Sequence, residues 1–460
     1  MPRERLGSRL GFILLSAGCA IGVGNVWKFP WMVGQYGGGA FVVCYVLFLL
    51  ILGLPIMTME FAIGRASQKS PVRAYQALEK PGSKWHIHGY LAMIGNYLLM
   101  MFYTTVCGWM LYYFYLTVSG RFVGATSEQV QAAFPEMLGK PVVMTVCMVA
   151  VVIVGFMINS FGLQGGLERV TKVMMIILLA IMVILAINSI MTEGSSEGLR
   201  FYLIPDLGRM QECGIANVIV AAMNQAFFTL SLGISAMEVF GSRIGKQNSL
   251  TGEALRICGL DTAVAILAGL IIFPACFAFA VAPDQGPSLV FVTLPNVFNQ
   301  MPLGQLWGTL FFVFMSFAAL STIIAVFENL ITFTMEKWDL DRKRALARTA
   351  VLVTVLSLPC ALGFNVLAGI TIPGIGDIQS IEDFIVSNNL LPLGSLLYVV
   401  FCVSRKGWGW DNFLAEADAG TGMKFPRWAR GWLTFGLPAL IIIIFIMGYV
   451  PKIMMWAGLA

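Results

Sequence analysis

Two polar interruptions fall in the middle of long apolar segments of the chain. The first is Gly18–Asn25, which contains three glycines and an asparagine, and the second is Phe228–Gly233, which contains two hydroxyl side chains and a glycine. Glycine weakens a helix by about 1 kcal/mol relative to alanine and tolerates unwound backbone. Unwound backbone inside a membrane offers N–H groups to an anion and carbonyl oxygens to a cation. Each interruption alone could instead reflect close helix packing, since Gly18 and Gly22 have small-xxx-small spacing.

The composition tells us where such chemistry would take place. Hydrophobic residues make up 58% of the 460 residues, charged residues make up 12%, and the mean hydropathy is +0.82. Soluble domains carry about 25% charged residues, and one soluble core could not bury this much apolar surface. We therefore predict an all-α polytopic membrane protein in a lipid bilayer.

Several other classes are disfavoured. A net charge of +5 gives no reason to expect a nucleic-acid partner, and two histidines, His86 and His88, argue against a histidine-rich metal site. The nine cysteines are odd in number and lie mostly in apolar runs, which argues against a disulfide framework. The first apolar run continues into Lys28-Phe29-Pro30 without a small-residue cleavage site, so we expect no removable signal peptide. We find no nucleophile–base pair with a histidine partner inside a span, so no enzyme is predicted.

Hydropathy predicts eleven spans. They are approximately Leu10–Lys28, Ala40–Ile63, Gly89–Val118, Pro141–Ile158, Val173–Met191, Ala216–Val239, Gly259–Ala282, Gly304–Thr334, Ala345–Ile370, Ile385–Val403 and Trp432–Pro451.

The distribution of basic residues predicts the orientation. If the N-terminus is cytoplasmic, most of the 29 lysines and arginines lie in cytoplasmic segments, which satisfies the positive-inside rule. The remainder fall outside or within spans: Lys28, Arg121, Lys140, Arg200, Arg209 and Lys452. An odd number of spans then puts the C-terminus outside the cytoplasm.

The interrupted spans are the first and the sixth, which occupy corresponding positions in two five-span halves. This pattern is typical of inverted-repeat transporters, whose site lies between discontinuous helices. We therefore predict one transmembrane domain over residues 1–460. It would contain a first inverted repeat at 10–193, a second at 216–403 and an eleventh helix at 432–457. Broken backbone facing lipid is too costly, so the breaks should line a cavity walled by protein.

Longer motifs in both halves resemble the neurotransmitter:sodium symporter family. They include Gly22–Pro30 (GVGNVWKFP), Gly37–Phe41 (GGGAF), Glu60–Arg65 (EFAIGR), Gln225–Ser231 (QAFFTLS) and Leu320–Thr322 (LST). The resemblance covers the chain from Arg3 to about Pro451. It implies the LeuT-like fold, with discontinuous first and sixth helices. Eleven spans and short termini resemble the bacterial branch, which implies the bacterial inner or plasma membrane.

The resemblance implies two sodium sites, and sodium prefers oxygen ligands. The first site would use the Ala20 carbonyl, the Asn25 side chain, Thr229 and Asp261. Ligands of the second site would be the carbonyls of Gly18, Ile21 and Ala318 and the hydroxyls of Ser321 and Thr322. These two hydroxyls could instead bond back to their own helix.

The implied substrate site lies between the breaks. Amides of Val23 and Gly24 and the Tyr103 hydroxyl would hold a carboxylate, while an ammonium would meet nearby carbonyls. Monoamine carriers place an aspartate where this chain has Gly22, so we expect an amino acid. The matched positions are Cys19, Ala20, Gly22, Val23, Gly24, Leu99, Tyr103, Phe228, Thr229, Ser231, Ile234, Thr322 and Val326. This mostly apolar set favours a neutral, hydrophobic side chain, because a charged one would be buried without a partner.

Charged positions at both ends of this path match the family's gates. Lys28 and Asp383 correspond to the outer ion pair, with lysine in place of the usual arginine. Arg3 and Glu336 correspond to the inner pair. Glu60 lies near an inner helix end, and we expect it to cap the neighbouring broken backbone.

Chloride should not be required. Chloride-dependent members of the family have asparagine at Asp261 and a serine one turn later, where this chain has Ala265. Asp261 would supply a fixed negative charge to sodium. Three alternatives are that Asp261 caps its helix, pairs with an inner arginine such as Arg256, or becomes protonated when sodium leaves.

The leading hypothesis is a sodium-coupled symporter that imports neutral hydrophobic L-amino acids, branched or aromatic, by alternating access. The alternatives are a membrane sensor that binds an amino acid without moving it, and a carrier of small amino acids such as glycine or alanine. A channel would use rings or symmetric subunits, of which the sequence gives no sign.

Overall fold

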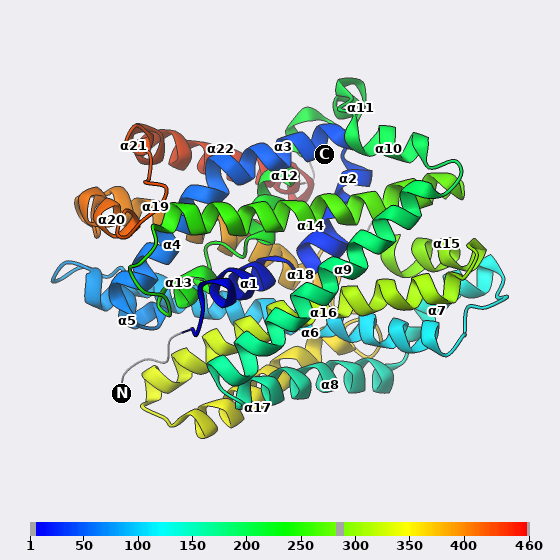
Figure 1. Ribbon diagram of the computed structural model, residues 1–460, viewed down its shortest axis with the longest axis horizontal. Helices are drawn as coiled ribbons and strands as arrows, with labels where there is room; N and C mark the ends of the chain where they lie inside the picture. Colours follow the sequence, from blue (N-terminus) through cyan, green and yellow to red (C-terminus); the bar gives the residue numbers. More distant parts are fainter. Residues whose placement is uncertain (1–5, 282–288, 458–460) are drawn as a thin grey trace.

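The computed structural model describes residues 6–281 and 289–457, and the regular structure within these ranges is almost entirely helical (Figure 1). The predicted all-α class is therefore confirmed. The helices of the first half are α1 (Arg9–Ala20), α2 (Phe29–Gln35), α3 (Gly39–Phe48), α4 (Leu54–Ser67), α5 (Pro71–Leu78), α6 (His86–Val118), α7 (Ser127–Leu138), α8 (Pro141–Ser160), α9 (Arg169–Met191), α10 (Ser196–Leu203) and α11 (Leu207–Glu212).

The second half continues the pattern. Its helices are α12 (Ile215–Thr229), α13 (Ala236–Gly241), α14 (Leu250–Ala278), α15 (Leu294–Gln300), α16 (Gly304–Trp338), α17 (Arg342–Leu362), α18 (Ile378–Ile385), α19 (Leu391–Val403), α20 (Trp410–Ala417), α21 (Ala429–Gly431) and α22 (Leu437–Trp456). Short π-helical turns join or precede several of them: η1 (Gly24–Lys28), η2 (Leu49–Gly53), η3 (Leu163–Glu168), η4 (Leu289–Thr293), η5 (Val386–Leu390) and η6 (Trp432–Gly436).

Within the described residues, nine continuous helices are long and apolar enough to cross a membrane. A tenth candidate is the pair Arg9–Ala20 and Gly24–Gln35, which is bent by 50° at a short break. The remaining predicted span corresponds to α12 and α13, and its apolar part, Ile215–Thr229, is too short to count alone. The first and sixth predicted spans are thus the two that are interrupted.

Several helix ends differ from the hydropathy prediction. The helix of the seventh predicted span, α14, begins at Leu250 rather than Gly259. Its first turns carry the charged residue Glu253, which pairs with Arg9 and Arg256. The helix of the ninth predicted span, α17, ends at Leu362. Residues 363–377 form turns rather than a helix that continues to Ile370. Hydropathy detects apolar segments. It therefore excludes the charged first turns of a helix and includes apolar residues that follow the end of a helix.

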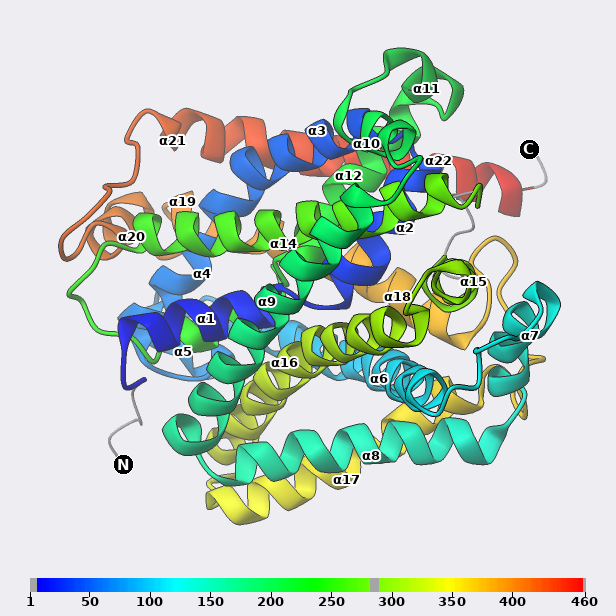
Figure 2. The same cartoon turned by 45° about the vertical axis from the view of Figure 1, so that its right-hand side comes forward.

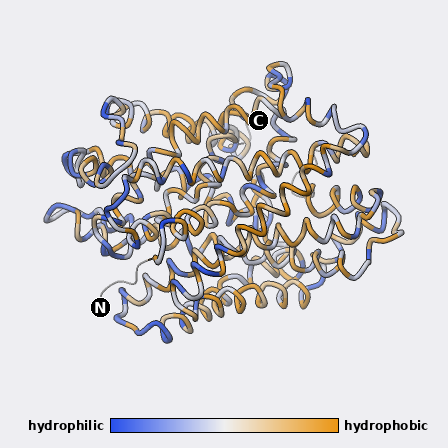
Figure 3. Tube along the Cα trace, in the orientation of Figure 1, coloured by the Kyte–Doolittle hydropathy of each residue, from blue (hydrophilic) through white to orange (hydrophobic). Residues whose placement is uncertain are grey.

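The packing places both interruptions at the centre. Helices α6 and α16 pack against each other and against α8 and α17, while α14 packs on α9 (Figures 1 and 2). Helix α1 contacts α14, α16 and α9, and α12 contacts η1. In Figure 2, α1 begins at one end of the bundle and α22 ends at the other. Hydrophobic residues occupy the middle of the helices, and hydrophilic residues gather at their two ends (Figure 3).

Candidate functional site

The first interruption is a true break in the helix. Helix α1 ends when Ile21 adopts an extended conformation (φ −73°, ψ 92°), and the chain resumes as the π-helical turn η1. The backbone groups released here find partners inside the protein. The Val23 amide donates to the Tyr103 hydroxyl at 2.7 Å, and Gln225 donates to the Gly24 carbonyl at 2.7 Å. The broken backbone is therefore held by α6 and α12.

The second interruption covers residues 230–235, between α12 and α13. Ser231, Gly233 and Ser235 all have positive φ angles, of 51°, 87° and 65°. The Gly233 amide donates to Glu60 at 2.6 Å, so the expectation that Glu60 caps broken backbone is confirmed. A Cβ at Gly233 would lie 2.3 Å from the Leu391 carbonyl, so glycine is needed both for the backbone conformation and for contact with α19.

A small cavity lies between the two breaks. Its lining is mostly apolar and consists of Ala20, Gly24, Leu99, Tyr103, Phe228, Ser231, Ile234 and Leu391. Seven of these residues were predicted from the sequence, and Leu391 was not. The six other predicted residues are buried but do not line the cavity itself: Cys19, Gly22, Val23, Thr229, Thr322 and Val326.

Gly22 sits where the walls of the site converge. A Cβ placed on it would lie 2.0 Å from the Tyr103 hydroxyl and 2.4 Å from the Thr322 hydroxyl. Any side chain at this position would therefore displace these two groups. The absence of a side chain leaves the Tyr103 hydroxyl next to the Val23 amide, where a carboxylate could approach both.

Beside the cavity, Asp261 on α14 is completely buried. Its carboxylate accepts hydrogen bonds from Asn25 (2.9 Å), Thr229 (3.1 and 3.2 Å) and Tyr45 (3.2 Å). All three donors are neutral, and within the described ranges no lysine or arginine pairs with this carboxylate. Arg256, which we considered as a partner, donates to Glu253 at 3.0 Å. A buried carboxylate without a positive partner is costly, so this cluster is suited to a cation.

A second cluster of oxygens joins the first break to α16. The Ser321 hydroxyl lies 2.8 Å from the Gly18 carbonyl, 2.9 Å from Ala318 and 3.5 Å from Ile21. The Thr322 hydroxyl lies 3.4 Å from the Gly18 carbonyl. The five groups predicted for the second sodium site are therefore brought together. Ser321 does bond back to its own helix, as the alternative supposed, but it also reaches α1.

The outer charged pair lies above the cavity. Lys28 contacts both Asp383 carboxylate oxygens, at 2.8 and 2.9 Å, and the Ser387 hydroxyl at 3.0 Å. Its ammonium also lies 4.1 Å from the ring centroid of Phe228, which lines the cavity. One aromatic ring therefore separates this ion pair from the cavity.

At the inner end, Arg3 lies outside the described residues. Its proposed partner Glu336 accepts a hydrogen bond from the Ser70 amide at 2.8 Å. Nearby, the buried carboxylate of Glu328 on α16 binds two arginines. Arg243 follows α13 and donates to Glu328 at 3.0 Å, and Arg342 at the start of α17 donates at 2.6 Å. This inner triad ties α13 to two helices of the surrounding framework.

Sequence reasoning missed Glu328, although a signal was present. A single carboxylate inside the apolar eighth span is rare and should have a named partner. The partners come from positions 85 residues earlier and 14 residues later in the chain, so spacing alone could not identify them.

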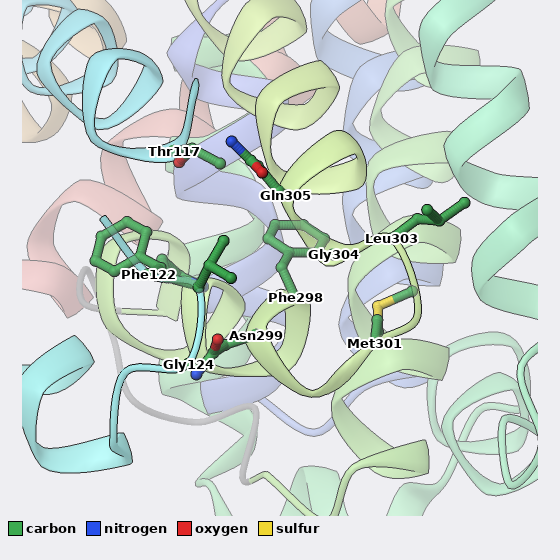
Figure 4. A pocket seen from close by; sticks show the side chains of 11 residues that line it. Thr117, Phe122, Gly124, Phe298, Asn299, Met301, Leu303, Gly304 and Gln305 are labelled. Carbon is green, nitrogen blue, oxygen red and sulfur yellow. The ribbon is translucent and has the colours of Figure 1, made fainter. Parts of the chain in front are cut away.

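A larger cavity, of about 270 Å³, opens at the outer end between the end of α6 and the α15–α16 junction (Figure 4). Asn299 and Gln305 donate to the carbonyls of Ala125 and Val118 across it. None of the described residues that line it is charged, and it lies away from both breaks, so we do not assign the transport site to it.

The structure has two broken helices around buried polar groups, and an ion pair lies next to them. This arrangement is typical of membrane transporters with discontinuous helices. The sodium:neurotransmitter symporter family model matches residues 3–131 and 129–455. The chain belongs to this family.

Individual proteins with similar sequences are also transporters or are described as such. The chain is 36% identical to the uncharacterized sodium-dependent transporter YhdH of Bacillus subtilis (strain 168), over 95% of this chain and 96% of that protein. Identity is 25% with the sodium-dependent serotonin transporter of Drosophila melanogaster, over 97% of this chain and 77% of that protein. The crystal structure of MhsT in complex with L-phenylalanine matches with a TM-score of 0.88 and 37% identity, covering 97% of this chain and 99% of that one. The predicted LeuT-like fold is confirmed.

Replacement of Glu328 by glutamine tests the inner triad. The substitution leaves two arginines without their buried negative charge, which should cost about 3–5 kcal/mol of stability. We expect a clear fall in the apparent Tm of the purified protein. Arg243→Gln combined with Glu328→Gln should lose less than the two single variants together, because the pair is removed as a unit. Glu136→Gln, in an exposed pair with Lys140, is the matched control and should have almost no effect. If Glu328→Gln melts like Glu136→Gln, the triad does not stabilise the inner end.

Proposed function

We propose that this protein is a sodium-coupled symporter that imports neutral hydrophobic L-amino acids by alternating access. One observation carries the proposal: the buried Asp261 carboxylate receives hydrogen bonds from Asn25, just after the first break, and from Thr229, just before the second, and from no positive group among the described residues. A cation bound there would neutralise the carboxylate and contact both interrupted spans. Sodium suits such a cluster because carboxylate, amide and hydroxyl oxygens are its preferred ligands.

We place a second sodium at the cluster formed by Gly18, Ile21, Ala318, Ser321 and Thr322. Support comes from the three carbonyls and two hydroxyls that converge there, on α1, its unwound end and α16. A cation at this position would fasten the first break to the framework helix. The two sites would therefore act on the same break from opposite sides.

The substrate proposal rests on the cavity. Its apolar lining by Leu99, Phe228 and Ile234 favours a hydrophobic side chain, and the groups near Gly22 suit a carboxylate. The presence of L-phenylalanine in the MhsT structure agrees with this class. A monoamine would leave the carboxylate-binding groups without a partner.

We further propose two inverted repeats, at 10–193 and 216–403, that exchange access around the site in a bacterial inner or plasma membrane. Lys28 and Asp383 would close the outer side. Arg3 and Glu336 would close the inner side, with the Arg243–Glu328 pair beside them. The N-terminus would face the cytoplasm.

Uptake into proteoliposomes tests this function. With an inward sodium gradient, the purified protein should accumulate phenylalanine or leucine, and uptake should vanish when potassium replaces sodium. Tryptamine should compete less well than tryptophan by about 5–150-fold, because it lacks the carboxylate that the Tyr103 hydroxyl and the Gly24 amide would bind, a loss of about 1–3 kcal/mol. Glycine and alanine in the same panel test the carrier of small amino acids.

Asp261→Ala should abolish sodium-driven uptake, and Glu136→Gln, which removes an exposed carboxylate, should leave it unchanged. Binding of phenylalanine without sodium-driven accumulation would favour the sensor instead. Tryptamine that competes as well as tryptophan would contradict the assigned substrate class.

Transport should not require chloride. At an effective dielectric of about 20, a sodium ion about 4 Å from the charge of the Asp261 carboxylate is attracted by about 4 kcal/mol. A chloride ion in the same region would be repelled by this carboxylate. The side chain at Ala265, one turn later on α14, has no hydroxyl to bind chloride.

Replacement of chloride by gluconate should therefore leave wild-type uptake unchanged. The variant that combines Asp261→Asn with Ala265→Ser should become chloride-dependent, while Asp261→Asn alone should lose uptake in either salt. Collapse of wild-type uptake in gluconate would exclude Asp261 as the charge that replaces chloride.

The proposed orientation places the C-terminus outside the cytoplasm. Alkaline phosphatase fused after Ala460 should be active in bacteria, because it folds only outside the cytoplasm, and a fluorescent protein that folds only inside should stay dark. The opposite pair of results would reject the orientation.

A further inference from the structure

A groove of about 440 Å³ lies on the outer surface of the bundle between α8 and α17, which run side by side in Figures 1 and 2. Its floor consists of Val152 and Phe156, which are almost completely buried, and Phe156 stacks on Phe327 of α16 at 4.1 Å. The walls are exposed apolar side chains, such as Ile153 on α8 and Val351 on α17, which are 60% and 65% exposed. The surface of the groove is therefore concave and apolar, and its floor is formed by well-packed side chains.

The side chains that line the groove offer an occupant no free hydroxyl donor. Only two hydroxyl groups line it, and each bonds to its own helix: Ser160 to the Met157 carbonyl at 2.6 Å, and Thr354 to the Ala350 carbonyl at 2.8 Å. An occupant therefore gains apolar contact and little else, which suits a hydrocarbon chain.

The length of the groove points to one leaflet of the bilayer. Its lining on α17 runs from Leu346 to Val355, a rise of about 14 Å along a helix. Half the thickness of the hydrocarbon core is about 15 Å. An acyl chain of one leaflet therefore matches the length of the groove.

Basic residues lie at the end of the groove where α17 begins. Lys343 precedes Leu346 by one turn and is exposed, and so is Arg344. Arg344 lies 3.4 Å from Asp341, and Arg348 stacks over the half-exposed ring of Trp338 at 4.5 Å. Tryptophan and arginine at a helix end mark the level of lipid headgroups. With Asp339 and Asp341 as the acidic groups of this turn, the rim of Trp338–Arg348 still has an excess of positive charge.

We propose that this groove binds an anionic glycerophospholipid, with one acyl chain between α8 and α17 and the phosphate near Lys343 and Arg344. Under the proposed orientation this is a lipid of the cytoplasmic leaflet. Negative charge on the headgroup complements the rim, and the apolar groove holds the chain in register with it. The lipid would fill the seam between two framework helices and leave the moving breaks untouched.

Native mass spectrometry of the purified full-length protein tests the proposal. The probes are phosphatidylglycerol and phosphatidylethanolamine with identical acyl chains, added in equal amounts in a mild detergent. The wild-type protein should retain phosphatidylglycerol in preference to phosphatidylethanolamine.

Lys343→Gln combined with Arg344→Gln should lower the retention of phosphatidylglycerol by about fivefold for each charge removed. Lys343→Arg should preserve it. Ala350→Phe, which fills the groove, should reduce retention of both lipids.

The matched control is Arg427→Gln combined with Arg430→Gln. This pair also removes two exposed basic residues, at the start of the last span beside the 82% exposed Trp428. It should leave the preference unchanged. Equal losses in both pairs would reduce the effect to general surface charge and overturn the site. Equal retention of the two lipids by the wild-type protein would also overturn the site. A third contrary outcome is a dimer of the wild-type protein that Ala350→Phe dissociates while the amount of bound lipid stays the same. Because no uptake is measured, the result is independent of the transport proposal.

Discussion

The structure depends on one constraint: backbone that leaves the helical hydrogen-bond pattern inside a membrane must find partners within the protein. Both interruptions meet this constraint with side chains from other helices. Tyr103 and Gln225 bond the first break, and Glu60 bonds the second. The helices that supply these groups are therefore fixed around the breaks. The cavity is the space that remains where the two breaks face each other.

Two buried carboxylates illustrate how charge separates framework from site. Glu328 binds two arginines at 3.0 and 2.6 Å, so its charge is balanced within the protein. Asp261 is as deeply buried but receives only neutral donors among the described residues. The first carboxylate can act as a permanent tie between helices. The second has no such partner among the described residues, and under the proposed function a transported cation would supply the positive charge.

The sequence was sufficient for the fold class, the positions of the interrupted spans and most of the cavity lining. The length of an apolar segment and the presence of glycines in its middle can both be read from a short stretch of sequence. The residues of both oxygen clusters were assigned from the longer motifs that resemble the family. It could not reveal Leu391, because an ordinary apolar residue of α19 enters the site only through its contact with Gly233. Nor could it reveal the partners of Glu328, because one lies 85 residues earlier, after α13, and the other 14 residues later, at the start of α17. Helix ends at Leu250 and Leu362 were missed because hydropathy does not detect charged helical turns or apolar loops.

The second break provides a direct route for coupling under the proposed function. Thr229 donates to Asp261, and the preceding residue, Phe228, lines the cavity and supports Lys28 of the outer ion pair. Adjacent residues therefore contact the cation cluster, the substrate space and the outer closure. Phe228 and Thr229 are the last two residues of helix α12, so a shift of this helix end alters all three contacts together. A bound cation that fixes Thr229 would thus favour the position of Phe228 that encloses a substrate. Under the proposed function, this linkage would supply the differential affinity between open and closed states that ligand-driven closure requires.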